Sequence, residues 1–156
     1  VGQVDGKIAI ITRTSLGVGR AIAFGFGHEG ARIVCTDIRV DARPEGYEDD
    51  GQMATAEMIT AKVGQACFVL ADVTHGKAVK SLVQQAVERF RRLEIMVINT
   101  EVFTRRRSSM ARLKKSAILS WRRMLKVYGT DANRLFVNSS NKVTVARSLI
   151  LSPSPG

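Results

Sequence analysis

The stretch IAIITRTSLGVGR, residues 8–20, decides the fold predicted for this chain. Its apolar run, rich in β-branched residues, ends at Thr12, and two glycines, Gly17 and Gly19, follow in a short turn. Such a run predicts a buried strand, and the residues after the turn predict a helix over 17–29. Glycines between a strand and a helix let backbone N–H groups approach a phosphate at the helix N-terminus. The stretch therefore predicts the beginning of a nucleotide-binding α/β fold.

The alternation of strand and helix continues along the first 100 residues. Strands are predicted over 7–12, 31–37, 66–73 and 93–99, and helices over 17–29, 52–64 and 75–92, the last one capped by Thr74. Nearly continuous apolar strands favour a parallel sheet that helices cover on both faces, and right-handed crossovers make it doubly wound. We therefore expect a Rossmann-like α/β fold truncated at four to five strands, with 134–138 or 142–152 as candidates for the fifth.

Composition is that of a globular protein with one core. The chain has 156 residues, of which 45% are hydrophobic, and no apolar run approaches the roughly 18 residues that a membrane span needs. Its first residues lack the basic n-region and the cleavage pattern of a signal peptide, so we expect a cytoplasmic protein. Cys35 and Cys67 fall inside predicted strands without metal-ligand spacing, which predicts buried reduced thiols and no metal site.

Charge divides the chain into two parts. Residues 1–100 carry 12 basic and 12 acidic side chains, whereas 101–156 carry 12 basic and two acidic ones, which accounts for the net charge of +10. We expect a dinucleotide-binding domain over 1–130 and a diverged, partly disordered remnant over 131–156. The basic segment 105–126 has the charge to bind nucleic acid or another acidic partner, but it lacks interleaved aromatic residues, which favours a solvated segment.

Polar residues end four of the predicted strands. They are Thr12, Asp37, Asp72 and Asn99. Ligands of open α/β sheets bind at the carboxyl ends of the strands, so these side chains are candidates for a nucleotide site. Asp37 lies 18 residues after Gly19, the spacing of an acid that accepts the ribose 2′-hydroxyl. A carboxylate there repels a 2′-phosphate, so NAD is favoured over NADP, although Arg39 is near enough to soften that preference.

Three stretches resemble the short-chain dehydrogenase/reductase family: ITRTSLGVGRAIAFGFGHEGARIVCTD, VLADVT and RLEIMVIN. The family has Thr-Gly-x-x-x-Gly-x-Gly at the first turn, Asp-Val after the third strand and Asn-Asn-Ala-Gly after the fourth. The resemblance implies a doubly wound sheet and hydride transfer between a nicotinamide and an alcohol or ketone. It also implies a cofactor-binding set: Gly17, Val18 and Gly19 at the diphosphate, Asp37 at the adenosine ribose, Asp72 and Val73 at the adenine, with Thr12, Ser15 and Asn99 completing the site.

The chain departs from the family pattern at several of these positions. Arg13 replaces the first glycine, where it obstructs the turn, relaxes it or binds a phosphate. Asn-Asn-Ala-Gly becomes Ile98-Asn99-Thr100-Glu101, and Glu101 would bring a carboxylate close to the cofactor. Tyr128 stands at the position of the family's helix asparagine, and Ser140 is the candidate for its catalytic serine.

The catalytic Tyr-x-x-x-Lys pair does not occur in these 156 residues. Tyr47 is followed four residues later by Gly51, and Tyr128 by Ala132. Because the phenol passes a proton to or from the substrate oxygen, we expect a truncated or inactive form, a pseudoenzyme. The alternatives are a non-enzymatic nucleotide-fold module whose basic C-terminal half binds nucleic acid or an acidic partner, and a decayed or frameshifted segment after residue 104. An uncovered sheet side beyond the fourth strand would favour a homo-oligomer.

Overall fold

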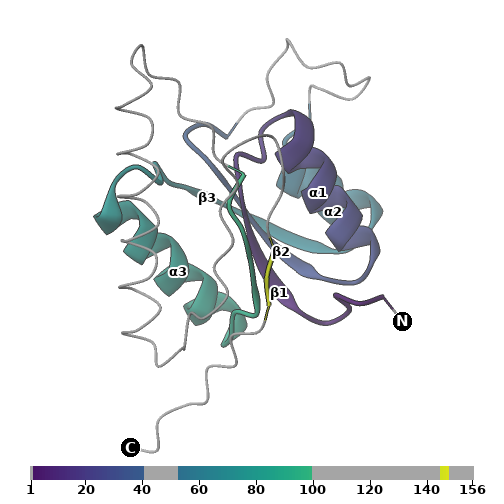
Figure 1. Cartoon of the computed structure of the whole chain (residues 1–156). Coiled ribbons are helices and arrows are strands. Elements are labelled where there is room, and N and C mark those ends of the chain that lie inside the picture. The colour runs from purple at the N-terminus through teal and green to yellow at the C-terminus, as the bar shows by residue number, and fades with distance from the viewer. Residues whose placement is uncertain (1, 41–52, 100–144, 148–156) are drawn as a thin grey trace, which may run out of the picture.

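The computed structural model describes residues 2–40, 53–99 and 145–147, and every structural statement below concerns these residues. The helices are α1 (Gly17–His28), α2 (Thr55–Lys62) and α3 (Gly76–Phe90). The strands are β1 (Ile8–Thr12), β2 (Arg32–Asp37), β3 (Gln65–Leu70), β4 (Ile95–Val97) and β5 (Val145–Arg147). Strand and helix alternate from β1 to β4, as the sequence predicts (Figure 1).

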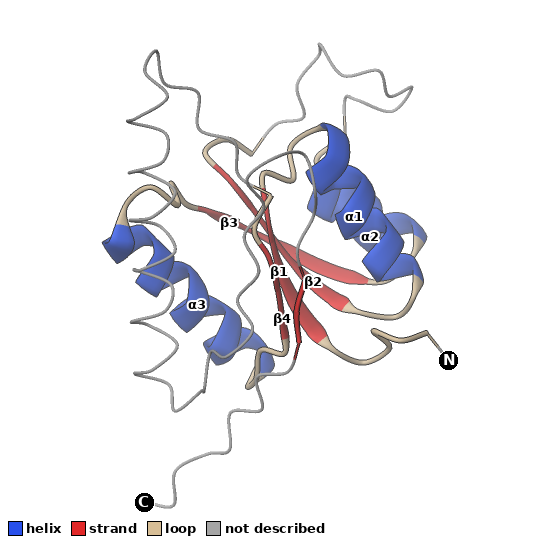
Figure 2. Ribbon diagram, viewed as in Figure 1, coloured by secondary structure: helices blue, strands red, loops and turns tan. Residues whose placement is uncertain are grey.

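The strands form a single sheet in the order β3-β2-β1-β4-β5. The first four are parallel: β1 pairs with β2 on one side and with β4 on the other. The chain builds outward from β1 to β3 and then crosses back to β4, so the strand order reverses between β1 and β4 (Figure 2). This reversal is the topological switch point at which ligands of doubly wound sheets bind.

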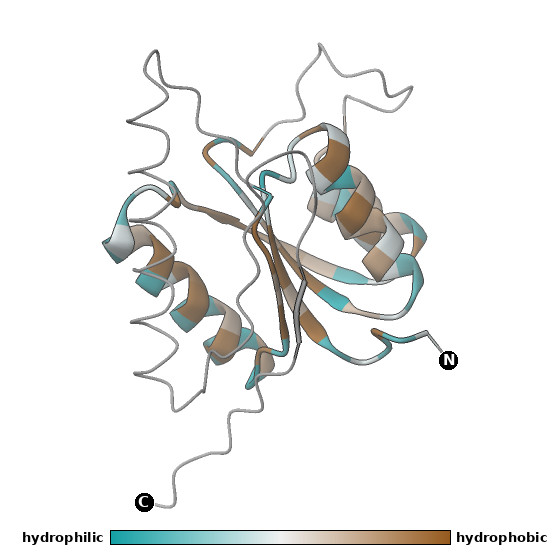
Figure 3. Cartoon of the chain, viewed as in Figure 1, coloured by the Kyte–Doolittle hydropathy of each residue, from teal (hydrophilic) through white to brown (hydrophobic). Residues whose placement is uncertain are grey.

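Helices cover both faces of the sheet, which explains the continuous apolar strands. Ala9 and Ile11 of β1 pack with Ala23 of α1 and Ile59 of α2 on one face. On the other face, alternate strand residues pack against α3; the buried set there includes Ile8, Ile10, Val34, Val79, Leu82 and Met96. Figure 3 shows the apolar colouring along the strands and on the sides of the helices that face them. The doubly wound Rossmann-like fold is thereby confirmed.

The fifth strand differs from a purely parallel arrangement. β5 pairs antiparallel with β4, with Val145 opposite Val97 and Arg147 opposite Ile95. This strand lies inside the candidate range 142–152, while 134–138 lies outside the described residues. The expectation that the side of the sheet beyond β4 is uncovered is wrong over these three residues, because β5 occupies that edge. The homo-oligomer inferred from it stays a prediction.

Two details of local structure also differ from the predictions. Helix α3 begins at Gly76 and its N-cap is His75, without a side-chain capping bond, so Thr74 does not cap it. Both cysteines are free thiols; Cys35 is buried, which raises its pKa to about 12, and Cys67 is half-buried. Across the described ranges, no helix combines the length and apolar character needed to cross a bilayer.

Candidate functional site

The turn between β1 and α1 keeps a shape that normally requires glycine. Arg13 and Gly17 both have φ of +56°, in the left-handed region. A residue with a Cβ pays about 1–2 kcal/mol for that conformation. Arg13 therefore holds a left-handed backbone conformation, which glycine adopts without strain.

Gly19 allows the first turn of α1 to lie directly against this loop. A Cβ on Gly19 would be 1.9 Å from the carbonyl oxygen of Arg13 and 2.9 Å from Nδ2 of Asn99. Both distances are far shorter than any van der Waals contact, so only glycine fits. The loop after β1, the start of α1 and the end of β4 consequently meet at Gly19.

The N-terminus of α1 is open to a ligand. Its N-cap is Leu16, in extended conformation, and no described side chain caps the helix or adds an acidic group to its first turn. The first backbone N–H groups of a helix have no partner within it, and together with the helix dipole they favour an anion. The Val18 side chain is 59% exposed, and no atom of the described residues lies within 4 Å of a Cβ built on Gly17. The residues present thus fit the diphosphate of a dinucleotide.

Asp37 lies at the end of β2 beside the same turn. Its Oδ2 accepts the backbone N–H of Ser15 at 3.0 Å, and its Oδ1 accepts that of Ile38 at 2.7 Å. The Ser15 hydroxyl donates to the carbonyl oxygen of Arg39 at 2.8 Å, which ties the segment after β2 to the turn. Each carboxylate oxygen keeps a further lone pair, so Asp37 can still accept a hydrogen bond from a ribose hydroxyl.

Thr12 and Asn99 connect the tips of β1 and β4 at the switch point. The Thr12 hydroxyl accepts the backbone N–H of Asn99 at 2.9 Å, and the Asn99 side chain approaches Gly19. Thr12, Gly19 and Asn99 are therefore in one cluster, and Ser15 with Asp37 forms the neighbouring one.

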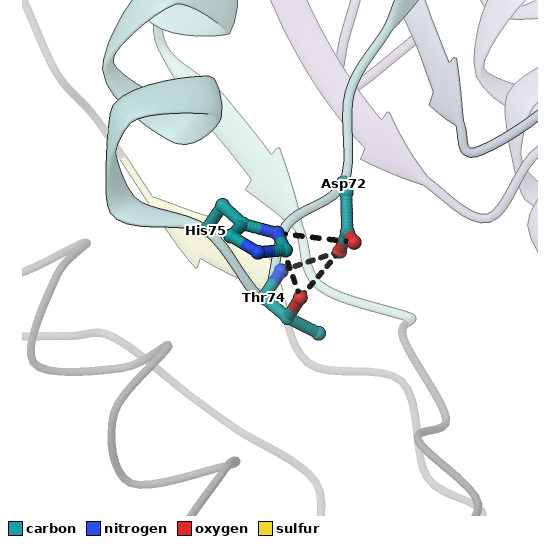
Figure 4. A network of polar contacts seen from close by, with 3 residues as sticks. All are labelled: Asp72, Thr74 and His75. Carbon is teal, nitrogen blue, oxygen red and sulfur yellow. Dashed lines mark hydrogen bonds and ion pairs between the residues drawn. The ribbon is translucent and has the colours of Figure 1, made fainter.

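Asp72 lies beyond the end of β3 and organises the loop before α3 (Figure 4). Its Oδ1 accepts the Thr74 hydroxyl at 2.6 Å and the Thr74 backbone N–H at 2.9 Å, and its Oδ2 lies 3.1 Å from Nδ1 of His75. The hydrogen bond from the Thr74 side chain is the largest influence and holds the pKa of Asp72 below its ordinary value. Burial opposes it as the second-largest influence, and the Thr74 backbone and His75 lower the pKa further. The carboxylate is therefore ionised and shapes the loop.

The Val73 side chain is buried in the core cluster that includes Val79 of α3. Its backbone is then the part that would face an adenine. Three residues singled out in the sequence, and one segment, lie outside the described ranges: Glu101, Tyr128, Ser140 and the basic segment 105–126. Among the residues that the structure does describe, no three His, Cys, Asp or Glu side chains are grouped closely enough to hold a metal ion.

Sequence reasoning missed two buried residues that are linked to the turn, Thr55 directly and Arg20 through Thr55. Arg20 is 2% exposed and donates to the carbonyl oxygen of Met53 at 2.8 Å and to Oγ1 of Thr55 at 3.0 Å. Thr55 in turn donates to the carbonyl oxygen of Thr14. The available signal was helical spacing, because Arg20 shares the buried face of α1 with Ala23 and Gly27.

Comparison with known proteins agrees with this geometry. Residues 7–130 match the family model described as short chain dehydrogenase. An uncharacterised oxidoreductase of Methylorubrum extorquens is 35% identical over 103 residues, which cover 66% of this chain and 38% of that protein. Glucose 1-dehydrogenase 2 of Bacillus subtilis is 36% identical over 98 residues, covering 63% of this chain and 35% of that protein. The chain thus spans little more than a third of these relatives.

A solved structure has the same arrangement of strands and helices. Carveol dehydrogenase from Mycobacterium avium, in complex with NAD, is 26% identical with a TM-score of 0.61, over 80% of this chain and 50% of that one. The doubly wound sheet, the turn after β1 and the match over residues 7–130 lead to one conclusion. This chain belongs to the short-chain dehydrogenase family.

Proposed function

We propose that this chain supplies the dinucleotide-binding part of a short-chain dehydrogenase and binds NAD(H). The observation that carries the proposal is the uncapped N-terminus of α1 behind a turn that keeps its left-handed residues, Arg13 and Gly17. Gly17, Val18 and Gly19 would face the diphosphate with their backbone N–H groups. Asn99, next to Gly19, would border the cofactor on the side of β4.

The position of Asp37 supports NAD over NADP. The Ser15 and Ile38 amides hold its carboxylate at the end of β2, beside the turn, where the ribose of the adenosine half would lie. A 2′-phosphate placed there would be repelled by the carboxylate charge. The NAD in the similar carveol dehydrogenase structure is in keeping with this assignment. Asp72, through its loop, and the Val73 backbone would border the adenine.

A bound nicotinamide would exchange a hydride with an alcohol or a ketone, as the family resemblance implies. The chain's own residues contribute the binding and orientation of that cofactor. The 156 residues contain no Tyr-x-x-x-Lys pair to move the accompanying proton. Ser140 is the candidate for the catalytic serine of the family. We therefore propose that this polypeptide binds the cofactor without catalysing turnover by itself.

Titration of the purified chain with NADH tests the proposal. Binding should raise and blue-shift the fluorescence of the dihydronicotinamide, and calorimetry with NADPH under the same conditions should give the weaker affinity. Oxidation of simple secondary alcohols with NAD should stay at the rate without protein. Absence of NADH binding at millimolar cofactor would refute the binding proposal, and measurable turnover would refute the proposed lack of catalysis.

A further inference from the structure

Two consecutive buried hydrogen bonds connect α1 and the start of α2 to the turn between β1 and α1. This relay runs from the guanidinium of Arg20 to Oγ1 of Thr55, the first residue of α2, and from that hydroxyl to the carbonyl oxygen of Thr14. We propose that Thr55, oriented by Arg20, is a positioning residue for the dinucleotide: it holds the turn in its binding shape without touching the ligand. This inference rests on the proposed binding of NAD(H).

Within the turn, Thr14 is the residue that hydrogen bonds fix in place. It is fully buried between Arg13, with its left-handed backbone, and Ser15, whose N–H is bonded to Asp37. Its own N–H and hydroxyl both donate to the carbonyl oxygen of Thr36 in β2, at 3.3 and 3.4 Å. These long bonds hold the turn from the sheet side, and the Thr55 hydroxyl holds the Thr14 carbonyl from the helix side.

The direction of the relay follows from the donor count. A threonine hydroxyl has one proton, and a guanidinium only donates. Because Nη1 of Arg20 donates to Oγ1 of Thr55, that oxygen accepts one hydrogen bond and the hydroxyl donates its own proton to another group. The acceptor is the Thr14 carbonyl oxygen. Arg20 therefore acts on the turn through Thr55. An apolar residue at position 55 would leave the buried Thr14 carbonyl without this donor.

The placement of Arg20 is otherwise unfavourable, which is consistent with a specific role. A buried guanidinium has to be hydrogen-bonded, and the N-terminus of a helix disfavours positive charge. Arg20 belongs to α1, but its guanidinium nevertheless lies against the beginning of α2. There it also donates to the carbonyl oxygen of Met53 and to Sδ of Met58. It thereby fixes the start of α2 relative to the turn.

The test compares Thr55→Val, which removes the hydroxyl, with Thr55→Ser, which keeps it. Thr60→Val is the matched control, because it removes a threonine hydroxyl of the same helix whose hydrogen bonds go to the carbonyl oxygens of Ala56 and Ala66 and not to Thr14. NADH affinity is measured by calorimetry, and hydrogen exchange of the ligand-free protein is followed at the amides of Thr14 and Ser15, with Ile10 of β1 as the reference.

We expect Thr55→Val to bind NADH about tenfold more weakly and to exchange the Thr14 and Ser15 amides about tenfold faster, with Ile10 unchanged. Thr55→Ser and Thr60→Val should stay within about twofold of the wild type. Unchanged binding and exchange in Thr55→Val would overturn the inference. An equal acceleration of amide exchange at Ile10 would also overturn the inference. It would mean that removal of the hydroxyl destabilises the whole domain and not the turn in particular.

Two further arms keep the outcome decisive. If circular dichroism shows that Thr55→Val does not fold, Arg20→Lys tests the same relay, because a lysine keeps the charge but lacks the fork that spans Met53 and Thr55. The same rise in turn exchange is then expected, and its absence overturns the inference. If the wild type binds no NADH, the proposed function has failed, and the exchange measurement alone decides the relay.

Discussion

Gly19 and Arg13 are in backbone contact: a Cβ on Gly19 would lie 1.9 Å from the carbonyl oxygen of Arg13. The two positions are therefore coupled, since the path of the chain at Arg13 determines how closely α1 can follow β1. The left-handed φ of Arg13 keeps that path although the residue is not glycine. A broken motif in the sequence thus corresponds to an intact turn in the structure.

Gly19→Ala should destabilise the domain and abolish NADH binding. The methyl group would meet a backbone carbonyl, which cannot rotate away as a side chain can, so we expect a loss of about 2 kcal/mol or more in the free energy of unfolding. Urea denaturation measures the loss, and an NADH titration measures the binding.

Gly25→Ala is the matched control for that substitution. It lies in the same helix, and none of the described residues has an atom within 4 Å of a Cβ built there. Alanine costs a helix less backbone entropy than glycine, so the expected change is a gain of up to about 1 kcal/mol. Equal destabilisation by both substitutions would contradict the contact between Gly19 and Arg13.

Arg13→Gly should stabilise the chain modestly. Relief of the left-handed strain at an arginine, about 1–2 kcal/mol, exceeds the extra backbone entropy that glycine loses on folding, about 0.5–1 kcal/mol. We expect a net gain of about 0.5–1 kcal/mol in urea denaturation. Arg32→Gly, in an exposed position of β2, should have the opposite sign. A loss of stability in Arg13→Gly would mean that the arginine side chain contributes more than its backbone conformation costs.

Asp37→Asn should reduce the preference for NADH over NADPH. The amide oxygen can still accept the Ser15 N–H, so the turn should persist. The amide nitrogen is a donor and cannot accept the Ile38 N–H, so that bond is lost, and the charge that repels a 2′-phosphate is removed. The ratio of the two dissociation constants, measured by calorimetry, should fall about tenfold, mostly through tighter NADPH binding. An unchanged ratio would place the selectivity elsewhere, with Arg39 as the next candidate.

The fold could be predicted because its signals are local. The apolar run at Ile8–Thr12 follows from burial on both faces of the sheet, and the helical spacing of α3 follows from burial of one helix face against the sheet. Strand ends were less predictable: β3 ends at Leu70, which is exposed, whereas Val73 beyond it is buried under α3. An apolar residue in a buried loop resembles a strand residue in sequence, so the predicted strand was too long.

The candidate site was predictable only where a residue type carries the geometry. By residue type and spacing, Gly17 predicts the turn and Asp37 predicts a candidate contact for the ribose. The left-handed backbone of Arg13 could not be predicted from the sequence, because glycine is the residue type that usually indicates this conformation. The contact of Thr55 with Thr14 joins residues 41 apart in the chain. A threonine at the start of a helix reads as a capping residue, so nothing local reveals that contact.

Asp72→Asn should make the protein less stable near neutral pH but not in acid. Folding holds the pKa of Asp72 below its ordinary value of 3.8, so the ionised carboxylate adds stability at pH values above 3.8. That contribution is lost as the pH falls below 3.8 through the folded pKa. Asparagine can still accept a hydrogen bond from Thr74, but it lacks the charge that attracts His75 when that ring is protonated.

Melting temperatures of the two proteins, measured from pH 7 to pH 2.5, should differ above pH 5 and converge at the acid end. Because this carboxylate is largely exposed, the difference should be small and should shrink in salt. A gap that persists at the lowest pH would show that the amide disturbs the loop itself, and a gap that widens in acid would contradict the direction of the pKa shift.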